Sequence, residues 1–189
     1  MINPTRHTLA VLVDNESGVL SRVARLFSGK GYNIESLAVG TTDDPAISRI
    51  TIEVLAGDQQ LDLLCNQLRK LICVHSVKSL KPEHAIRREL MLIKVLSGDS
   101  VQRNEIIQIA NIFRASIIDV SKASITLAVI GDERKTEAIQ NLLTEFGILE
   151  LVRTGMVALE RGQYTIDEQT KEKGEFDYGK NILRDVEHL

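Results

Sequence analysis

The chain has 189 residues, 43% of them hydrophobic, so it is long enough to bury a core as one domain or as two small ones. Its 23 basic and 26 acidic residues are well mixed and give a formal net charge of −3, which creates no field able to hold a polyanion. We therefore expect neither nucleic acid nor a membrane surface as a partner.

Signals for export, membrane insertion and metal binding are not found in the sequence. No run of about 18 apolar residues occurs, and the opening MINPTR lacks the basic-then-apolar profile of an export signal, so a cytoplasmic protein is expected. Cys65 and Cys73 have no CxxC motif and no flanking histidine pair. We therefore expect two buried, reduced thiols and no metal site.

The first 80 residues predict strands and helices in the order βαββαβ. The strands are predicted over residues 7–13, 33–42, 47–55 and 72–80, and the helices over residues 19–27 and 58–71. The sequence GKG at 29–31 suits the end of the first helix, and TDDP at 42–45 supplies turn residues for a hairpin. In the third strand apolar residues alternate with Arg49, Thr51 and Glu53, so one of its faces is expected to meet solvent.

The same order recurs, with weaker similarity, after the polar joint KPEH at 81–84. Here the strands are predicted over residues 88–96, 117–120, 124–130 and 148–159, and the helices over residues 104–113 and 133–146. The spacing of the last helix is expected to turn Ile139, Leu142 and Leu143 inward.

The predicted fold class is α+β, with two ferredoxin-like βαββαβ modules. The first module spans residues 5–81 and the second residues 86–160, while the polar residues 161–189 form a tail to which no function is assigned. The first strand is apolar on both faces, since Ala10 and Leu12 alternate with its other apolar residues. Both faces need cover, so a dimer is expected.

The loop between the first strand and the first helix carries the chemistry. The first N–H groups of a helix have no internal partners and a partial positive charge, so a loop that leaves them uncovered accepts a carboxylate. Gly18 removes the side chain that would shield them, and Asn15 and Asn33 can offer amide groups to a zwitterion. The same residues also make an ordinary β-to-α turn, so the residues alone leave both interpretations open.

The stretch from Asp14 to Gly40, DNESGVLSRVARLFSGKGYNIESLAVG, resembles the opening of the ACT domain in the small regulatory subunits of acetohydroxyacid synthase (AHAS, acetolactate synthase). The run NESG, the later GYNIESL, and TDDP followed by SRITI carry this resemblance. It extends over residues 7 to about 160 and is looser in the second module, where IDV at 118–120 is the most family-like piece.

The resemblance implies that residues 5–81 are an amino-acid-binding ACT domain. In the family, ACT domains pair side by side into a homodimer with one continuous sheet, and the effector lies between the NESG loop of one subunit and the GYNI segment of the other. Carried over, the effector-binding residues are Asn15, Glu16, Ser17, Gly18, Val19, Leu20, Asn33 and Ile34. The amides around Ser17 to Leu20 would receive the carboxylate, Asn15 and Asn33 the ammonium group, and Val19, Leu20 and Ile34 would form an apolar wall.

The resemblance further implies a non-catalytic regulatory subunit that stimulates a separate catalytic large subunit and confers feedback inhibition by valine. Valine, leucine and isoleucine are not ranked by the sequence, because one methylene discriminates by only about 1–3 kcal/mol. No cofactor is expected on this chain, whereas thiamine diphosphate, Mg²⁺ and FAD are implied for the catalytic subunit. The exposed Arg22 and Arg25 are candidates for contact with that subunit.

The sequence also bears on three other classes of protein: an enzyme, a transcription regulator and a free-standing sensor. The four histidines lie in different predicted elements with no neighbouring carboxylate or nucleophile motif, so no catalytic residue is predicted. An ACT-type, amino-acid-responsive transcription regulator would need a DNA-reading helix-turn-helix, for which the two modules leave no room. A free-standing amino-acid sensor remains an alternative, and it predicts no large partner.

Overall fold

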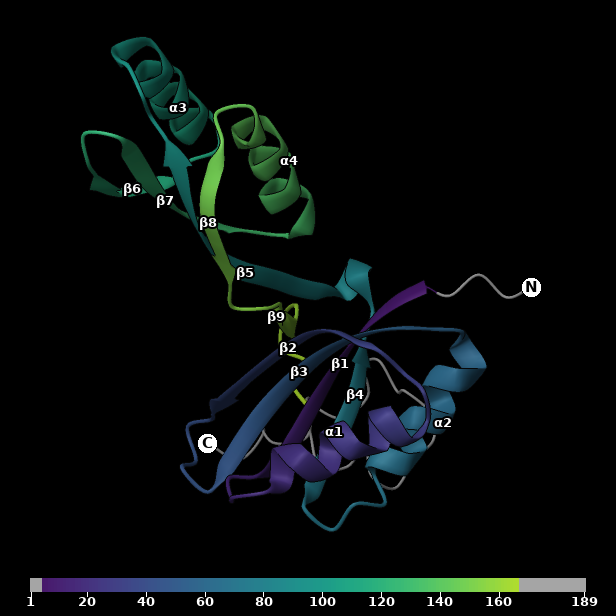
Figure 1. The fold of residues 1–189 in the computed structure, drawn as a ribbon. Coiled ribbons are helices and arrows are strands. Elements are labelled where there is room, and N and C mark those ends of the chain that lie inside the picture. The colour runs from purple at the N-terminus through teal and green to yellow at the C-terminus, as the bar shows by residue number, and fades with distance from the viewer. Residues whose placement is uncertain (1–4, 167–189) are drawn as a thin grey trace. The chain divides into compact units, whose positions relative to one another are not determined.

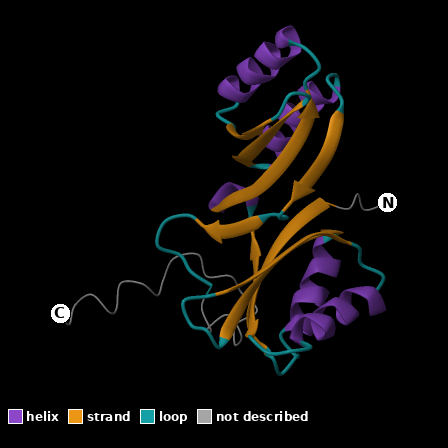
Figure 2. Ribbon diagram, turned by 60° about the vertical axis from the view of Figure 1, so that its left-hand side comes forward, coloured by secondary structure: helices purple, strands orange, loops and turns teal. Residues whose placement is uncertain are grey.

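The computed structural model describes residues 5–166, which form two compact units, each a sheet with two helices on one side (Figures 1 and 2). The first unit contains the described residues up to Ile86 together with those from Ala158 onward, and the second unit is Arg87–Val157. The predicted order βαββαβ and the α+β class are confirmed in both units. Residues 167–189, most of the predicted tail, lie outside the described residues.

The first unit is a four-stranded antiparallel sheet with the strand order β2-β3-β1-β4. Its elements are β1 (Thr5–Asp14), α1 (Val19–Gly29), β2 (Ile34–Thr41), β3 (Ile47–Ala56), α2 (Asp58–Leu68), β4 (Val74–Leu80) and the short 3-10 helix η1 (Pro82–His84). Since β1 and β2 are both antiparallel to β3, they run in the same direction.

Periodicity explains the core of the first unit. Alternate residues of β1, among them Leu9 and Val11, point toward the helices, and Val19, Val23 and Phe27 follow one another at four-residue intervals on α1. All five are buried, and Phe27 is fully inaccessible. The cysteines Cys65 and Cys73 are unpaired and buried here, as predicted.

The helix-free face of the first sheet is not the solvent-exposed surface that the alternation in β3 predicted. Thr51 and Glu53 are each only 3% exposed, and Ala10 on the neighbouring strand is fully buried. Ala10 packs in a small cluster with Ala158 and the partly buried Ile166, which belong to the chain as it returns after the second unit. The prediction was wrong because strand periodicity shows which residues share a face and gives no information on what covers that face.

The second unit repeats the plan with the strand order β6-β7-β5-β8 and a short strand β9 that also pairs with β5. Its elements are β5 (Ala85–Leu96), α3 (Ser100–Ile112), β6 (Ser116–Val120), β7 (Ser124–Gly131), α4 (Glu133–Thr144) and β8 (Ile148–Arg153). Strand β9 (Val157–Glu160) follows, and all of it except its first residue groups with the first unit. Asp99 caps α3 by accepting from the Gln102 N–H at 2.8 Å, and Asp132 caps α4 by accepting from the Lys135 N–H at 3.0 Å.

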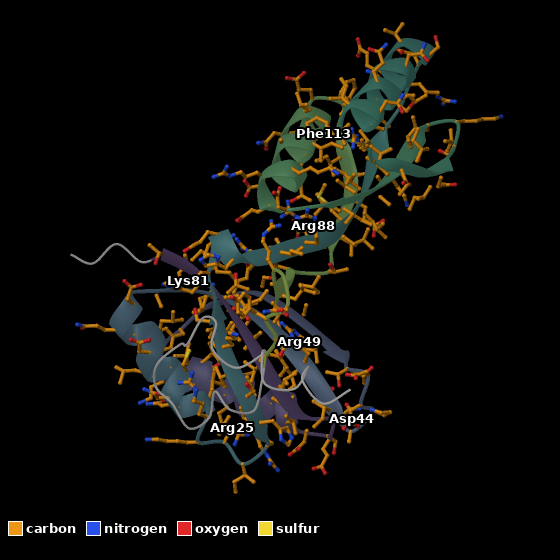
Figure 3. The ribbon with its side chains drawn as sticks, turned by 180° about the vertical axis from the view of Figure 1, so that it is seen from behind. Arg25, Asp44, Arg49, Lys81, Arg88 and Phe113 are labelled. Carbon is orange, nitrogen blue, oxygen red and sulfur yellow. The ribbon has the colours of Figure 1, made fainter. Side chains whose placement is uncertain are left out.

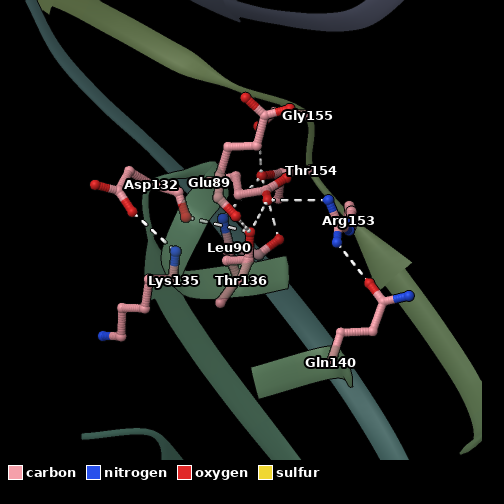
Figure 4. Close-up of polar contacts among 10 residues, drawn as sticks. Glu89, Leu90, Asp132, Lys135, Thr136, Gln140, Arg153, Thr154 and Gly155 are labelled. Atoms are coloured by element: carbon pink, nitrogen blue, oxygen red, sulfur yellow. Dashed lines mark hydrogen bonds and ion pairs between the residues drawn. The ribbon is translucent and has the colours of Figure 1, made fainter. Parts of the chain in front are cut away.

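A polar network joins β5, α4 and β8 inside the second unit (Figure 4). Glu89, only 5% exposed, accepts hydrogen bonds from Thr136 Oγ1 at 2.5 Å and from Arg153 Nη1 at 3.3 Å. Arg153 Nη2 in turn donates to Gln140 Oε1 at 2.6 Å. Movement of β8 away from α4 would break these bonds and leave the buried carboxylate of Glu89 without partners, which is costly in free energy. The network therefore fixes the position of β8 against α4.

Several details of the elements differ from the sequence predictions. The run 148–159, predicted as one strand, is broken after Arg153, and its last part forms β9; residues 158–160, assigned to the second module, group with the first unit. Leu142 was expected inside but is 45% exposed, while Ile139 and Leu143 are fully buried. The strand predicted from position 72 begins at Val74, and Ile72 is 98% exposed.

Candidate functional site

The start of helix α1 is open to solvent. Gly18 precedes the helix with φ 83° and ψ −9°, the left-handed conformation that favours glycine, and it carries no side chain to cover the first turn. A Cβ at Gly18 would have nothing within 4 Å, and within the described residues no side chain caps this helix. Its first N–H groups can therefore donate hydrogen bonds to a carboxylate, although the Val19 N–H also makes a long bond of 3.4 Å to the Glu16 carbonyl.

Asn15 does not cap α1 but fastens the loop to the turn between β2 and β3. Its Nδ2 donates to the Pro45 carbonyl at 2.8 Å, its Oδ1 accepts from Ser48 Oγ at 3.0 Å, and its backbone N–H donates to the Ala46 carbonyl at 2.7 Å. The amide keeps one N–H and one lone pair for a ligand. The turn is itself braced, since Asp44 Oδ1 accepts from the Ala46 N–H at 2.9 Å; Figure 3 shows Asp44 at this turn.

The other predicted site residues of the loop differ in exposure. Glu16 and Ser17 are exposed, and Leu20 is 41% exposed beside the helix start. Val19, in contrast, is only 3% exposed and belongs to the core, so its side chain contributes nothing to an apolar wall. At this end of α1, Leu20 and not Val19 presents an exposed apolar side chain.

Asn33 and Ile34 lie at the opposite end of α1 from Gly18. Helix α1 has 11 residues, which at 1.5 Å per residue separate its ends by about 16 Å (Figure 1). Asn33 is exposed and donates from Nδ2 to Glu35 Oε1 at 2.7 Å, while the partly buried Ile34 opens β2 and packs against the core. Within one chain the structure therefore does not bring the two halves of the predicted site together.

Sequence reasoning missed two partners of the loop. Ser48, which is 6% exposed and holds Asn15, lies in the conspicuous run SRITI, but only the antiparallel pairing of β1 with β3 places it there. Likewise His75 Nε2 lies 2.6 Å from Asp14 Oδ1, which corrects the expectation that the histidines have no carboxylate beside them. These two residues are 61 positions apart, and the β1–β4 pairing joins them.

Residues 5–166 contain neither a metal-binding group nor a membrane-spanning helix. No group of three histidine, cysteine, aspartate or glutamate residues there could hold a metal ion. In the same part of the chain, none of the helices is long and apolar enough to cross a membrane.

Comparison with known proteins identifies the family. The AHAS small subunit-like ACT domain matches residues 9–76, and the family described as the small subunit of acetolactate synthase matches residues 88–162. The acetolactate synthase small subunit of Mycobacterium bovis is 48% identical over 161 residues, which cover 85% of this chain and 95% of that protein. The one from Aquifex aeolicus is 46% identical over 167 residues, which cover 88% of this chain and 86% of that protein.

A solved structure extends the similarity to three dimensions. The crystal structure of the acetolactate synthase small subunit from Thermotoga maritima is 37% identical, with a TM-score of 0.79, and the match covers 85% of this chain and 99% of that one. The family matches over both modules, the similar sequences and the solved structure all point to the same family. The chain belongs to the family of acetolactate synthase small subunits.

Proposed function

We propose that the chain is a regulatory subunit that stimulates the catalytic subunit of acetolactate synthase and makes it subject to inhibition by valine. The observation that carries the proposal is the open N-terminus of α1, where Gly18 leaves the first amides uncovered and Asn15 lies beside them on a braced loop. A carboxylate binds such amides, and an ammonium group can bind the amide oxygen of an asparagine.

The strand directions support completion of the site by a second subunit. Strand β2 is an edge of the sheet and runs parallel to β1, so it ends on the side where the Asn15 loop lies, as the contact with Pro45 shows. If two β2 edges pair antiparallel across a two-fold axis, each begins where the other ends. Asn33 and Ile34 of the partner subunit then approach Gly18 of this one.

The proposed dimer would thus bring together the two half-sites, which lie at opposite ends of α1 within one chain. It also satisfies the unpaired backbone groups along the β2 edge, where Val39 is 49% exposed. The argument from the first strand is weaker than the sequence suggested, because Ala10 is already covered by residues of its own chain. The edge strand, rather than the face of β1, is therefore the proposed dimer contact.

The expected affinity follows from the groups available. Two or three charge-assisted hydrogen bonds, each contributing about 1.5–3 kcal/mol, give a Kd between micromolar and sub-millimolar once association entropy is subtracted. Leu20 and Ile34 of the partner subunit would contact the aliphatic side chain. Which branched-chain amino acid binds best is left to measurement, with valine as the first probe.

Regulation requires that valine bind two states of the subunit unequally. We propose that the valine-free dimer stabilises the active arrangement of the catalytic subunit, and that valine favours a less stimulating arrangement. A coupling free energy of about 1–3 kcal/mol, typical of allosteric proteins, corresponds to roughly 5- to 150-fold. The catalytic chemistry, with the thiamine diphosphate, Mg²⁺ and FAD expected for it, is assigned to the larger partner.

Two measurements test this function. Calorimetry of the purified chain against the twenty amino acids should show binding of a branched-chain amino acid and of few others, and a chain that binds none contradicts the proposed site. Mixing with the catalytic subunit should raise its activity, and valine should lower it again. Retention on DNA at low salt, without any stimulation of the synthase, would instead favour a transcription regulator.

A further inference from the structure

A short return segment covers the helix-free face of the first sheet. We call residues 158–166 the strap; it follows the second unit directly and packs within the first unit. Ala158 lies in an apolar cluster with Ala10, Leu80 and Ala85, and the partly buried Ile166 packs against the same cluster. The Arg161 N–H donates to the His84 carbonyl at 2.8 Å. The strap is therefore held by apolar burial as well as by hydrogen bonds.

Two basic residues on different strands of the sheet form polar contacts with the strap. On β4, Lys78 forms an ion pair with Glu160, and its Nζ also donates to the Thr165 carbonyl at 3.0 Å. On β3, Arg49 Nη2 donates to the Ala158 carbonyl at 2.7 Å. Lys78 pairs across the sheet with Ala10 of β1, and Arg49 pairs with Leu12, so the strap passes over β1 from the β3 side to the β4 side.

These contacts are buried, so water screens their electrostatic attraction only a little. The side chain of Glu160 is 4% exposed and that of Lys78 is 12% exposed, so this ion pair is little screened. Burial lowers the pKa of Arg49, and the carboxylate of Glu160 opposes that change. Removal of either charge leaves an uncompensated partner in a buried setting, and the segment would then be expected to loosen.

Arg49 also directly follows Ser48, the residue whose side chain holds Asn15 of the effector loop. On the face of the sheet that carries the helices, Ser48 donates a hydrogen bond to Asn15. Arg49 points to the opposite face, where it donates to the Ala158 carbonyl. Any shift of β3 that alters the Ser48–Asn15 bond therefore moves Arg49 as well, because adjacent residues of a paired strand move together. Figure 3 shows Arg49 on this face.

We propose that Arg49, Lys78 and Glu160 form a mechanical link that carries the state of the effector loop to the strap, and through the continuous chain to the second unit. This inference rests on the proposed regulation by valine. Arg49, Lys78 and Glu160 are positioning residues: they touch neither effector nor substrate, and they set how strongly valine binding changes the stimulation of the catalytic subunit.

The test separates binding from its consequence. Glu160→Gln keeps the shape and one acceptor for Lys78 but removes the charge. The full-length variant should stimulate the catalytic subunit and bind valine within about twofold of the parent, while the fold-inhibition at saturating valine drops by about fivefold or more, the lower limit of typical coupling. The matched control is Glu150→Gln, which removes a carboxylate 3.6 Å from Lys94 that is 67% exposed and should change none of the three values.

Two further measurements keep the outcome decisive. Arg49→Lys retains the charge but shortens the reach to Ala158, and it should also reduce inhibition more than valine affinity. In the parent, hydrogen exchange at Glu160 and Arg161 should change several-fold when valine binds. The link is overturned if the Glu160→Gln chain folds and valine inhibits it as fully as it inhibits the parent. If that variant does not fold, unaltered hydrogen exchange in the strap of the parent overturns the link. A parent chain that valine does not inhibit refutes the proposed function itself.

Discussion

Replacing Gly18 with aspartate places a carboxylate where the carboxylate of valine is proposed to bind. The substitution has room, because a Cβ at this position meets nothing within 4 Å. The cost to folding is therefore confined to the left-handed backbone, φ 83°, and is about 1 kcal/mol for a residue as tolerant as aspartate. The negative charge at the start of α1 recovers about 0.3–1 kcal/mol of this.

The cost to binding is larger than the cost to folding. The new carboxylate competes for the amides and repels the effector, so at least one charge-assisted bond of about 1.5–3 kcal/mol is lost, which weakens binding by roughly 10- to 150-fold. Gly18→Asn is the matched control, since it has the same shape and the same backbone demand without the charge. The Asp variant should bind valine at least about tenfold more weakly than the Asn variant.

Calorimetry with valine measures this difference directly, and light scattering and stimulation of the catalytic subunit show that both variants are intact. A Gly18→Asp chain that is folded, dimeric and stimulating, yet binds valine as tightly as Gly18→Asn, would refute the assignment of the carboxylate to the start of α1.

Three other predictions follow from single contacts. Ser48→Ala removes the hydroxyl that donates to Asn15 Oδ1 at 3.0 Å, so valine affinity in calorimetry should fall about fivefold, the effect of about 1 kcal/mol, and an unchanged affinity would show that Asn15 needs no support. Burial raises the pKa of the Cys65 thiol from 9.0 to about 11, so the folded state favours the protonated thiol; this stabilisation is complete below pH 9 and is lost as the pH rises to 11. In urea unfolding, the parent should lose about 2–3 kcal/mol more than Cys65→Ala over that interval, and equal losses would contradict the assignment. Ile139→Ala, at a fully buried position, should lower the unfolding free energy by about 2–5 kcal/mol, whereas Leu142→Ala, at a 45% exposed position, should lower it by less than about 1 kcal/mol; similar values for the two would show that the helix faces another way.

Errors in the sequence-based prediction have a common physical origin. Periodicity reports which residues of one element share a face, and it placed Ile139 and Leu143 correctly in the core. It does not report what covers a face. For that reason Thr51 and Glu53 were expected in solvent although the strap buries that side of the sheet.

The candidate site shows the same division. Gly18 and Asn15 could be singled out from the loop sequence, because an uncapped helix start and nearby amides are local features. Ser48 and His75 could not, because antiparallel pairing of β1 with β3 and with β4 brings them beside Asn15 and Asp14. Val19 was assigned to an apolar wall, but its place on the buried side of α1 depends on how the helix docks.

By itself the sequence determined the two βαββαβ modules and the approximate position of most elements, since these follow from short-range spacing and from the backbone demands of glycine; it also singled out the loop at which an effector is proposed to bind. Only the tertiary structure decided that the half-sites lie at opposite ends of α1, that β2 is an open edge, and that residues after Ala158 return to cover the first sheet. Such features depend on contacts between residues far apart in the chain, and local conformational preference carries no record of them.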